Sequence, residues 1–382
     1  MEGERRRLLP VSVLTGFLGS GKTTVLNHLI RQPLLDRTLV IVNEFGEIGL
    51  DHDLMAISQD DTVIEMSSGC LCCTIRGDLV KTLRDAPGRY AREGKLWFDR
   101  VVIETTGLAD PAPILHTLMT DQRVSRRYRL DGVITTVDAV NGADTLGAQI
   151  ESAKQAAVAD RLVLTKTDLV NEDELRTLQD RLRGLNPAAP QLIANNGQVD
   201  PSSLFDAGLF DPETKTPDVQ NWLRAEAYSD HHNGHGHGHG HGHGHDHDHD
   251  HDGDHQDVNR HDEHIRAFCL TIDDPIDGQK FEAWMDTLQT FQGPNLLRIK
   301  GIINVTELDV PVVVHGVQHI FHPPVTLEKW PSDDHRSRIV FITRDMKEST
   351  LLDTLRLFTG IRLPSQQSAE LPDAEVNVGE PR

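Results

Sequence analysis

The sequence predicts an α/β protein, in which a domain with a mostly parallel sheet is followed by a smaller α+β domain. The chain has 382 residues, enough for two or three domains of about 150 residues each. Between residues 11 and 222, short apolar runs rich in Val and Ile alternate with longer amphipathic runs. This alternation is typical of parallel strands covered by helices on both faces. A histidine-rich stretch, Ser229–His264, separates this part from a C-terminal part with a different pattern.

The first part contains seven candidate strands, each a nearly continuous apolar run of the kind that is buried on both faces. They are expected at Val11–Thr15, Thr38–Asn43, Thr62–Met66, Arg100–Thr105, Gly132–Val137, Arg161–Thr165 and Gln191–Ala194. Helical patterns lie between several of them, for example at Thr24–Ile30 and Glu172–Leu185. This order of elements predicts a mostly parallel sheet with helices on both sides.

The second part mixes strand and helix patterns and predicts a small α+β domain. Strands are expected at Ile265–Ile272, Leu297–Val305, Pro311–Gly316 and Arg338–Ile342, and helices at Phe281–Phe291 and Lys347–Phe358. The chain therefore divides into a first domain (1–228), a linker (229–264), a second domain (265–370) and a loose tail (371–382).

The linker alternates His with Gly and then His with Asp. It holds 14 of the 21 histidines and nine acidic residues, and Val258 is its one large aliphatic residue. Such a segment buries too little apolar surface to offset its ordering entropy, so we expect it to be disordered. Its imidazoles are suited to Zn²⁺, Ni²⁺ or Co²⁺. It is either a device for metal capture and storage or a soluble spacer.

Charge and composition exclude several classes of protein. A formal net charge of −21 argues against nucleic-acid binding, which needs a basic face. The longest uncharged run near the N-terminus, Leu8–Gly21, falls short of the about 20 apolar residues of a membrane helix. Three of the four cysteines crowd into four positions, which excludes a disulfide framework and indicates reduced thiols and a cytoplasmic location.

The strongest motif is GFLGSGKT, residues Gly16–Thr23, between a predicted strand and a predicted helix. It matches the phosphate-loop pattern in the context that the pattern requires. Its glycines let backbone N–H groups turn toward phosphate oxygens, Lys22 would reach the β- and γ-phosphates, and the Thr23 hydroxyl would bind Mg²⁺. The expected nucleotide-binding residues of this loop are Gly16, Gly19, Ser20, Gly21, Lys22, Thr23 and Thr24.

The tetrapeptide TKTD, Thr165–Asp168, follows a later strand and resembles the guanine-recognising motif of GTPases. Asp168 would accept hydrogen bonds from guanine, which adenine cannot donate, and the Lys166 stem would lie along the base. Many GTPases have Asn where this chain has Thr165, which leaves one loop-bracing hydrogen bond open. The first domain is thus expected to be a P-loop GTPase domain that binds GTP and Mg²⁺.

Acidic residues at strand ends are the candidates for the hydrolytic step. Glu104 ends the strand in VVIETTGLADP and would bind Mg²⁺ or orient water, while Gly107 would place a backbone N–H near the γ-phosphate. The acidic loop NEFGEIGLD carries Glu44, Glu47 and Asp51 and has the composition of a nucleotide-sensing switch. With Lys22, we take Glu104 and Glu44 as the catalytic candidates; which acid positions the water stays open.

The segment SSGCLCCTIRGDL brings Cys70, Cys72 and Cys73 together. Thiolates this close repel one another unless a cation holds them, and Zn²⁺ is the first candidate. A site of three Cys, or of two Cys with a carboxylate or water, would leave one position weakly held and able to release metal. A redox cluster and inert buried thiols are the alternatives. Cys269 lies in the other domain and is expected to be core.

Together, LTGFLGSGKTT, NEFGEIGLD, GCLCC, ETTGLADP and TKTDL resemble the CobW group of G3E GTPases, which are zinc and cobalt metallochaperones. GVQHIFHPP and RSRIVFI are similar to the group's C-terminal domain. The resemblance implies that GTP and Mg²⁺ bind the first domain. It implies that Cys70, Cys72 and Cys73, with Glu47 as a possible oxygen ligand, hold Zn²⁺ or Co²⁺, and that hydrolysis releases the ion to a client apoenzyme.

The resemblance further implies that Thr23 and Glu104 lie on the Mg²⁺ side of the nucleotide and that the C-terminal domain meets the client. A protein that buffers metal through its histidine tract, with nucleotide as regulator, is the alternative function. His315, His319 and His322 are either half-buried structural residues or a metal site near the domain interface.

Overall fold

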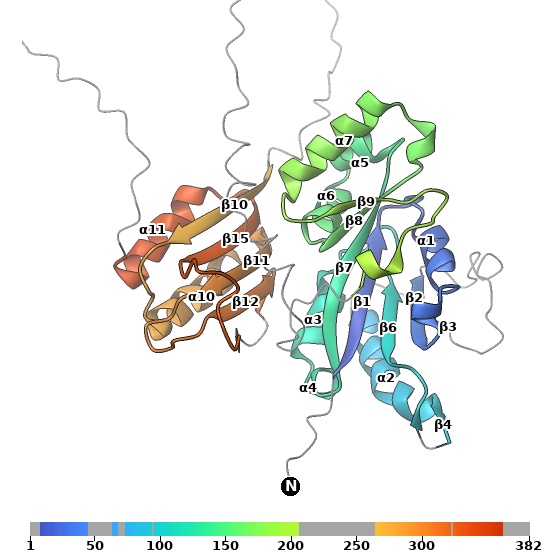
Figure 1. Cartoon of the computed structure of the whole chain (residues 1–382), viewed down its shortest axis with the longest axis horizontal. Coiled ribbons are helices and arrows are strands. Elements are labelled where there is room, and N and C mark those ends of the chain that lie inside the picture. Colours follow the sequence, from blue (N-terminus) through green and yellow to red (C-terminus); the bar gives the residue numbers. More distant parts are fainter. Residues whose placement is uncertain are drawn as a thin grey trace, which may run out of the picture.

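The computed structural model describes residues 8–44, 63–67, 73–93, 95–205, 264–321 and 324–361, and at 43–44, 63–67 and 73–76 it describes the backbone alone. Two sheets dominate these ranges and lie side by side in Figure 1. The first belongs to residues 9–193 and the second to residues 265–344.

The first sheet has seven strands in the order β3-β2-β6-β1-β7-β8-β9, and every pair is parallel. The strands are β1 (Leu9–Gly16), β2 (Thr38–Glu44), β3 (Val63–Ser67), β6 (Arg100–Glu104), β7 (Tyr128–Asp138), β8 (Arg161–Thr165) and β9 (Gln191–Ile193). The parallel α/β fold is confirmed. The largest shift is at β7, which begins four residues before the predicted Gly132.

That early start of β7 has an electrostatic cause. Arg129 and Asp131 look too polar for a buried strand, but both are buried, and Asp131 accepts hydrogen bonds from Ser12 (2.9 Å) and Arg100 (2.8 Å). A buried carboxylate that is hydrogen-bonded to guanidinium and hydroxyl groups is tolerated within a sheet.

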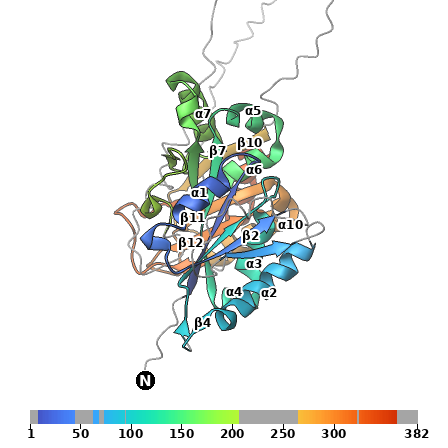
Figure 2. The same ribbon diagram turned by 90° about the vertical axis from the view of Figure 1, so that its right-hand side faces the viewer.

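Helices cover both faces of this sheet (Figures 1 and 2). One face packs against α2 (Cys73–Arg89), α3 (Ala112–Thr120), α4 (Gln122–Ser125), α5 (Gly142–Ala148), α6 (Ile150–Ala157) and α7 (Glu172–Leu185), and the other against α1 (Lys22–Leu29). The side-chain alternation follows: Val101 and Ile103 face α2 and α3, whereas Val102 faces α1. Short 3₁₀ turns lie at Pro33–Leu35, Thr167–Leu169 and Pro201–Ser203, and a small hairpin joins β4 (Ala91–Arg92) to β5 (Lys95–Leu96).

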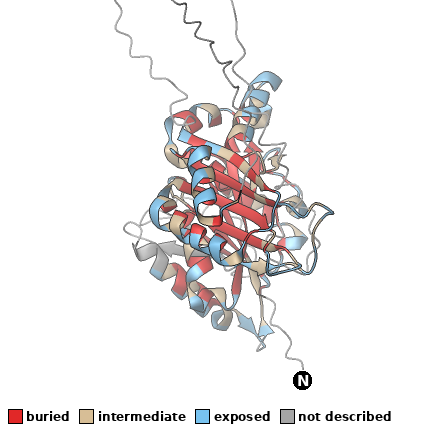
Figure 3. Ribbon diagram, turned by 90° about the vertical axis from the view of Figure 1, so that its left-hand side faces the viewer, coloured by how far each residue is buried: buried red, intermediate tan, exposed pale blue. Residues whose placement is uncertain are grey.

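The second sheet is antiparallel, with the order β10-β15-β11-β12-β13 and β14 paired to β12. Its strands are β10 (Ile265–Ile272), β11 (Leu296–Ile303), β12 (Val312–Val317), β13 (Ile320–Phe321), β14 (Val325–Thr326) and β15 (Ser337–Arg344). One face packs against α10 (Gly278–Gln292) and α11 (Glu348–Thr359) around the buried Trp284 and Phe341. The strands of this sheet are largely buried and form the red layer behind the helices in Figure 3. This architecture is the predicted α+β domain.

The other face of the second sheet lies against α3 and α6 of the first domain. Along β11, Ile299 and Ile303 point to the helices of their own domain, whereas Arg298 and Lys300 point to Asp160 of the first. Val317 and Ile320 join the apolar core of the first domain. Within the described ranges, every helix is too short or too polar to span a bilayer.

Candidate functional site

A glycine cradle follows β1 at the carboxyl edge of the parallel sheet, where ligands of such sheets bind. Gly16, Gly19 and Gly21 have φ values of +144°, +71° and +86°, which L side chains rarely adopt. A Cβ atom at Gly16 would lie 2.3 Å from Thr136 Oγ1 and 2.5 Å from the Thr136 carbonyl oxygen. The loop therefore requires glycine, and it leads directly into α1, whose N-terminus favours anions.

Hydroxyl groups from the ends of β7 and β8 brace the cradle. Ser20 Oγ and Thr136 Oγ1 share a hydrogen bond of 2.7 Å, and Thr136 also donates to the Thr15 carbonyl (3.3 Å). The Thr165 hydroxyl donates to the Ser20 carbonyl at 2.8 Å. Thr165 thus braces the phosphate loop, which answers the question that its departure from Asn raised. Thr136 was missed in the sequence, because it has no motif of its own.

Lys22 and Thr23, at the start of α1, face two different partners. The Lys22 ammonium donates to the carbonyls of Gly16 (3.0 Å) and Phe17 (3.2 Å), so it lies over the loop. The Thr23 hydroxyl donates to Glu104 Oε1 at 2.9 Å. Glu104 is buried at the end of β6. A hydroxyl next to a buried carboxylate is a set of hard oxygen ligands that fits Mg²⁺.

The loop after β6 packs directly on the phosphate loop. A Cβ atom at Gly107 would lie 2.6 Å from the Leu18 backbone nitrogen and 2.8 Å from Leu18 Cα, so only glycine permits this approach. Gln155 of α6 holds the loop from behind, since its Nε2 donates to the carbonyls of Gly107 (3.2 Å) and Ala109 (2.9 Å). Gln155 is a second residue that sequence reasoning missed.

The TKTD segment lies at the end of β8, beside the cradle. Lys166 adopts a left-handed conformation (φ 56°), and its ammonium lies 2.6 Å from Asp138 Oδ2 at the end of β7. Burial of Asp138 opposes its ionisation, but hydrogen bonds from Lys166, Asn141 and the Val140 backbone outweigh burial and hold its pKa below the usual range. Asp138 thus holds the Lys166 side chain in place.

Asp168 follows on a 3₁₀ turn with an exposed side chain. An exposed carboxylate at this edge is free to accept a bidentate pair of hydrogen bonds from a guanine base. The turn after β9 approaches α1: a Cβ atom at Gly197 (φ +79°) would lie 2.8 Å from Thr24 Cγ2. This turn, Asn195–Gln198, is closed by two backbone hydrogen bonds and had no predicted role.

Several predicted residues lie outside what the structure describes. Glu47, Asp51, Cys70 and Cys72 fall outside the described ranges, as does His322. Glu44 ends β2 and Cys73 begins α2, but their side chains are not described. Because β2 and β3 run parallel to β1, their ends and the start of α2 lie at the carboxyl edge of the sheet, where the phosphate loop lies.

The remaining histidines and the fourth cysteine do not form a metal site in the described part of the chain, which contains no group of three or more His, Cys, Asp or Glu side chains able to hold an ion. His315 is buried, and His319 contacts His116 of α3 edge to face, with ring centroids 5.7 Å apart. Burial raises the pKa of the Cys269 thiol to about 11, so this thiol stays protonated. Cys269 is only partly buried on β10 and lies outside the apolar core in which it was predicted.

A parallel sheet, a glycine cradle between β1 and α1, and a Lys–Asp motif after β8 define a P-loop GTPase. Residues 10–193 match the model of the CobW/HypB/UreG nucleotide-binding domain, and residues 265–359 match the model of the cobalamin synthesis protein cobW C-terminal domain. The chain therefore belongs to the CobW family of G3E P-loop GTPases, as the sequence motifs predicted.

The relatives extend over nearly the whole chain. The zinc chaperone YjiA of Escherichia coli K12 is 30% identical over 354 residues, which cover 93% of this chain and 99% of that protein. The zinc chaperone CobW of Pseudomonas aeruginosa is 29% identical over 381 residues, 91% of each protein. The crystal structure of Zn(II)-bound YjiA GTPase from E. coli matches with a TM-score of 0.63 at 26% identity, covering 94% of this chain and all of that one.

Proposed function

We propose that this protein is a GTP-hydrolysing metallochaperone that binds Zn²⁺, or Co²⁺, at its C-x-C-C motif and transfers the ion to a client metalloprotein when GTP is hydrolysed. The observation that carries the proposal is the close packing of Gly107 on Leu18 next to the Thr23–Glu104 pair. A loop that touches the phosphate cradle this closely is suited to sense the γ-phosphate. Relatives named zinc chaperones support the choice of cargo.

The nucleotide-binding roles follow from the chemistry of each group. Residues 16–24 cradle the phosphates, Lys22 neutralises the β- and γ-phosphates, and Asp168 with Lys166 selects guanine. Thr23 and Glu104 hold Mg²⁺, which when bound neutralises charge on the phosphate oxygens. Glu104 and Glu44 are the candidates that orient the attacking water. With no further activating group assigned, we expect the intrinsic turnover to be slow.

The metal-binding roles rest on the sequence motif and on where the flanking backbone lies. Cys70, Cys72 and Cys73 are the proposed thiolate ligands, with Glu47 as an oxygen ligand. Cys73 begins α2 and Glu44 ends β2, both at the nucleotide edge of the sheet. Loops that respond to the γ-phosphate at this edge would change the geometry of the thiolates. Such thiolates need a reducing compartment, so we place the protein in the cytoplasm.

A direct contact joins the first domain to the second through the loop after β6, residues 105–111, which we call the γ-phosphate loop. Gln318, in the turn between β12 and β13, donates through Nε2 to Asp110 Oδ2 at 3.1 Å. Asp110 also lies 3.6 Å from the Lys154 ammonium of α6. We propose that the second domain (265–370) receives the nucleotide signal through this contact and presents it to the client. Residues 1–228, 229–264 and 371–382 are then the GTPase domain, the linker and the tail.

The test is a competition titration of Zn²⁺ into a variant that lacks Ser229–His264, with a GTP analogue and with GDP. Removal of the tract matters because its imidazoles would mask the signal. We expect one ion to bind more tightly in the GTP-like state, and Cys72→Ala to abolish that binding. By linkage, Zn²⁺ must then tighten GTP binding by the same factor.

Cys269→Ala is the matched control, because it removes a cysteine that lies in the other domain. Equal Zn²⁺ affinity in the two nucleotide states would refute delivery from the cysteines. If deletion of the histidine tract instead removes physiological metal binding, and Cys72→Ala has no effect, the result would support the buffering function.

A further inference from the structure

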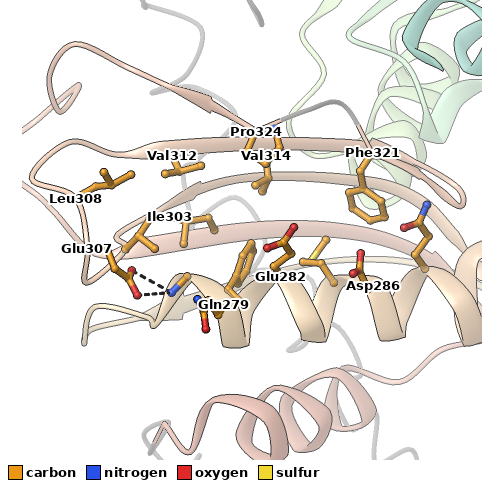
Figure 4. Close-up of a pocket in the computed structure, with 15 residues that line it drawn as sticks. Gln279, Glu282, Asp286, Ile303, Glu307, Leu308, Val312, Val314, Phe321 and Pro324 are labelled. Carbon is orange, nitrogen blue, oxygen red and sulfur yellow. Dashed lines mark hydrogen bonds between the residues drawn. The ribbon is translucent and has the colours of Figure 1, made fainter. Parts of the chain in front are cut away.

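The second domain has an open groove between α10 and the strands β11 and β12 (Figure 4). Its volume is about 530 Å³, within the range of about 300–1,000 Å³ that proteins use to bind ligands. The groove exists because α10 and α11 cover β10, β15 and β11, whereas β12 and its short partners β13 and β14 extend the sheet beyond them. It lies on the face opposite the first domain.

The floor of the groove is apolar by the alternation of the strands. Ile303 and Val305 come from the β11 side, and Val312 and Val314 from β12, where each faces α10 because its neighbour faces the first domain. Met285 of α10 and Phe321 of β13 complete the floor. Leu308, at one end, is 42% exposed. A continuous apolar surface of this kind is typical of a site for a partner protein.

The rim of the groove is acidic. Glu282 and Asp286 lie one turn apart on α10, on the side that faces the strands, and Glu307 lies across from the start of the helix (Figure 4). Glu307 accepts hydrogen bonds from the Gly278 backbone nitrogen at 3.1 and 3.2 Å, so its charge is fixed at the helix N-terminus. Among the described lining residues three are acidic and none is basic.

The two acids of α10 are not neutralised by their surroundings. Both side chains are exposed, and neither forms an ion pair with a residue in the described ranges. A partner that brings cations to Glu282 and Asp286 gains attraction without first breaking an existing pair.

We propose that this groove docks a segment of the client protein in which large apolar side chains are flanked by lysine or arginine. The inference rests on the proposed function and names the surface and the chemistry of its partner. Charge complementarity selects this occupant over the acidic segments of the chain outside the described ranges. Residues 1–7 carry Arg5, Arg6 and Arg7, but Met1 is their one large apolar residue, so they lack the apolar pattern that the floor of the groove requires. The region 206–263 is strongly acidic, and the tail past residue 361 carries four acidic residues, Glu370, Asp373, Glu375 and Glu380, against Arg362 and Arg382.

The groove is also next to the contact that joins the two domains. Val314 and Phe321 lie on the strands that flank the β12–β13 turn, and that turn carries Gln318 with its hydrogen bond to Asp110. The same pair of strands therefore touches the γ-phosphate loop and lines the docking groove. This arrangement would let the nucleotide state alter the affinity for a docked segment.

The test uses three labelled amphipathic peptides of about 15 residues, some four helical turns. They share one pattern of Leu and Phe and differ in their flanking residues, which are Lys, Gln or Glu. Fluorescence anisotropy with the full-length protein should show binding in the order Lys, Gln, Glu, with the Lys peptide weakened by added salt. Equal binding of all three peptides, or binding of none, would overturn the proposal.

Matched variants locate the site. The double substitution Glu282→Lys and Asp286→Lys should weaken the Lys peptide by about tenfold or more. Asp274→Lys with Asp333→Lys, exposed acids of the same domain outside the groove, makes the same change in net charge and should have little effect. Equal weakening by both pairs would place binding elsewhere and refute the groove.

A second pair tests the apolar floor without disturbing the core. Leu308→Asn should weaken binding, whereas Leu357→Asn, on α11 and 80% exposed, should not. Self-association of the unmodified protein that the Glu282 and Asp286 substitutions abolish would assign the groove to a second copy and contradict the proposal. The groove variants should keep their GTP turnover and their Zn²⁺ titration, so failure of the groove is distinguishable from failure of the chaperone function.

Discussion

Substitution of Asp160 by Asn tests the interface between the two domains. The Asp160 side chain is 1% exposed and accepts a hydrogen bond from the Val133 backbone nitrogen through Oδ2 (2.9 Å). Its Oδ1 accepts from Arg298 and from Lys300 Nζ, the latter at 2.6 Å. One buried carboxylate thus faces two buried cations of the second domain.

The loss of stability can be worked out from the charges at this site. Asparagine keeps the size of the side chain but removes the negative charge that faces the buried Arg298 guanidinium, and Lys300 can give up its proton because its pKa is already lowered. Removal of one partner of a buried ion pair costs about 3–5 kcal/mol. At the lower limit of about 2 °C per kcal/mol for longer chains, the melting temperature should fall by roughly 6–10 °C. Since the loss falls on the interface, the two domains should also unfold as separate transitions.

Differential scanning calorimetry of the full-length variant measures both effects. Asp99→Asn is the control, because Asp99 pairs with Arg37 at the surface, where both side chains are more than half exposed and a pair contributes about 0–1 kcal/mol. A melting temperature of Asp160→Asn equal to that of the control would refute the reasoning that the buried carboxylate holds the domains together.

Three further outcomes are expected. Burial and the neighbouring guanidinium lower the pKa of Lys300 to about 7, so the folded state binds fewer protons than the unfolded state from there up to about pH 10. The free energy of unfolding from urea titrations should rise with pH across this window, and Lys300→Met should remove that rise. Gly16→Ala places a Cβ against Thr136 and should weaken GTP binding by more than about tenfold in nucleotide titrations, whereas Gly184→Ala, in open space on α7, should leave it unchanged. Asp168→Asn removes two charge-assisted hydrogen bonds, about 3 kcal/mol, and should weaken GTP roughly hundredfold while improving the binding of xanthosine triphosphate.

Much of the fold could be predicted because buried parallel strands have a strong local signature. All seven strands of the first sheet and the four long strands of the second occur where apolar runs predict them. The capping box of Asn171 with Glu174 explains why α7 begins at Glu172, as predicted. The start of β7 could not be predicted, because Asp131 and Arg100 are compatible with a sheet interior only as partners, and they lie 31 residues apart.

In the candidate site too, residues with a local sequence signal could be predicted, and residues that act through a distant partner could not. The geometry of the loop GFLGSGKT could be predicted from the sequence, because its glycines supply the positive φ values that such a loop requires. Thr136, Asp138 and Gln155 could not, since each acts through a partner that the fold brings from a distant strand or loop. Their identities, a hydroxyl, a carboxylate and an amide at element ends, are common in any sequence and give no local signal.

The short helix α6 occupies a position with consequences for how the molecule can move. Its Gln155 holds the loop that packs on the phosphate cradle, and the carbonyl of Val158, just past its end, accepts a hydrogen bond from Arg298 of the second domain. Eight residues of helix span about 12 Å and do not bend appreciably over that length. We therefore expect a displacement of the loop to tilt α6 as a rigid element and to move Arg298 and the second domain with it. Domain motions of this kind generally take microseconds to milliseconds.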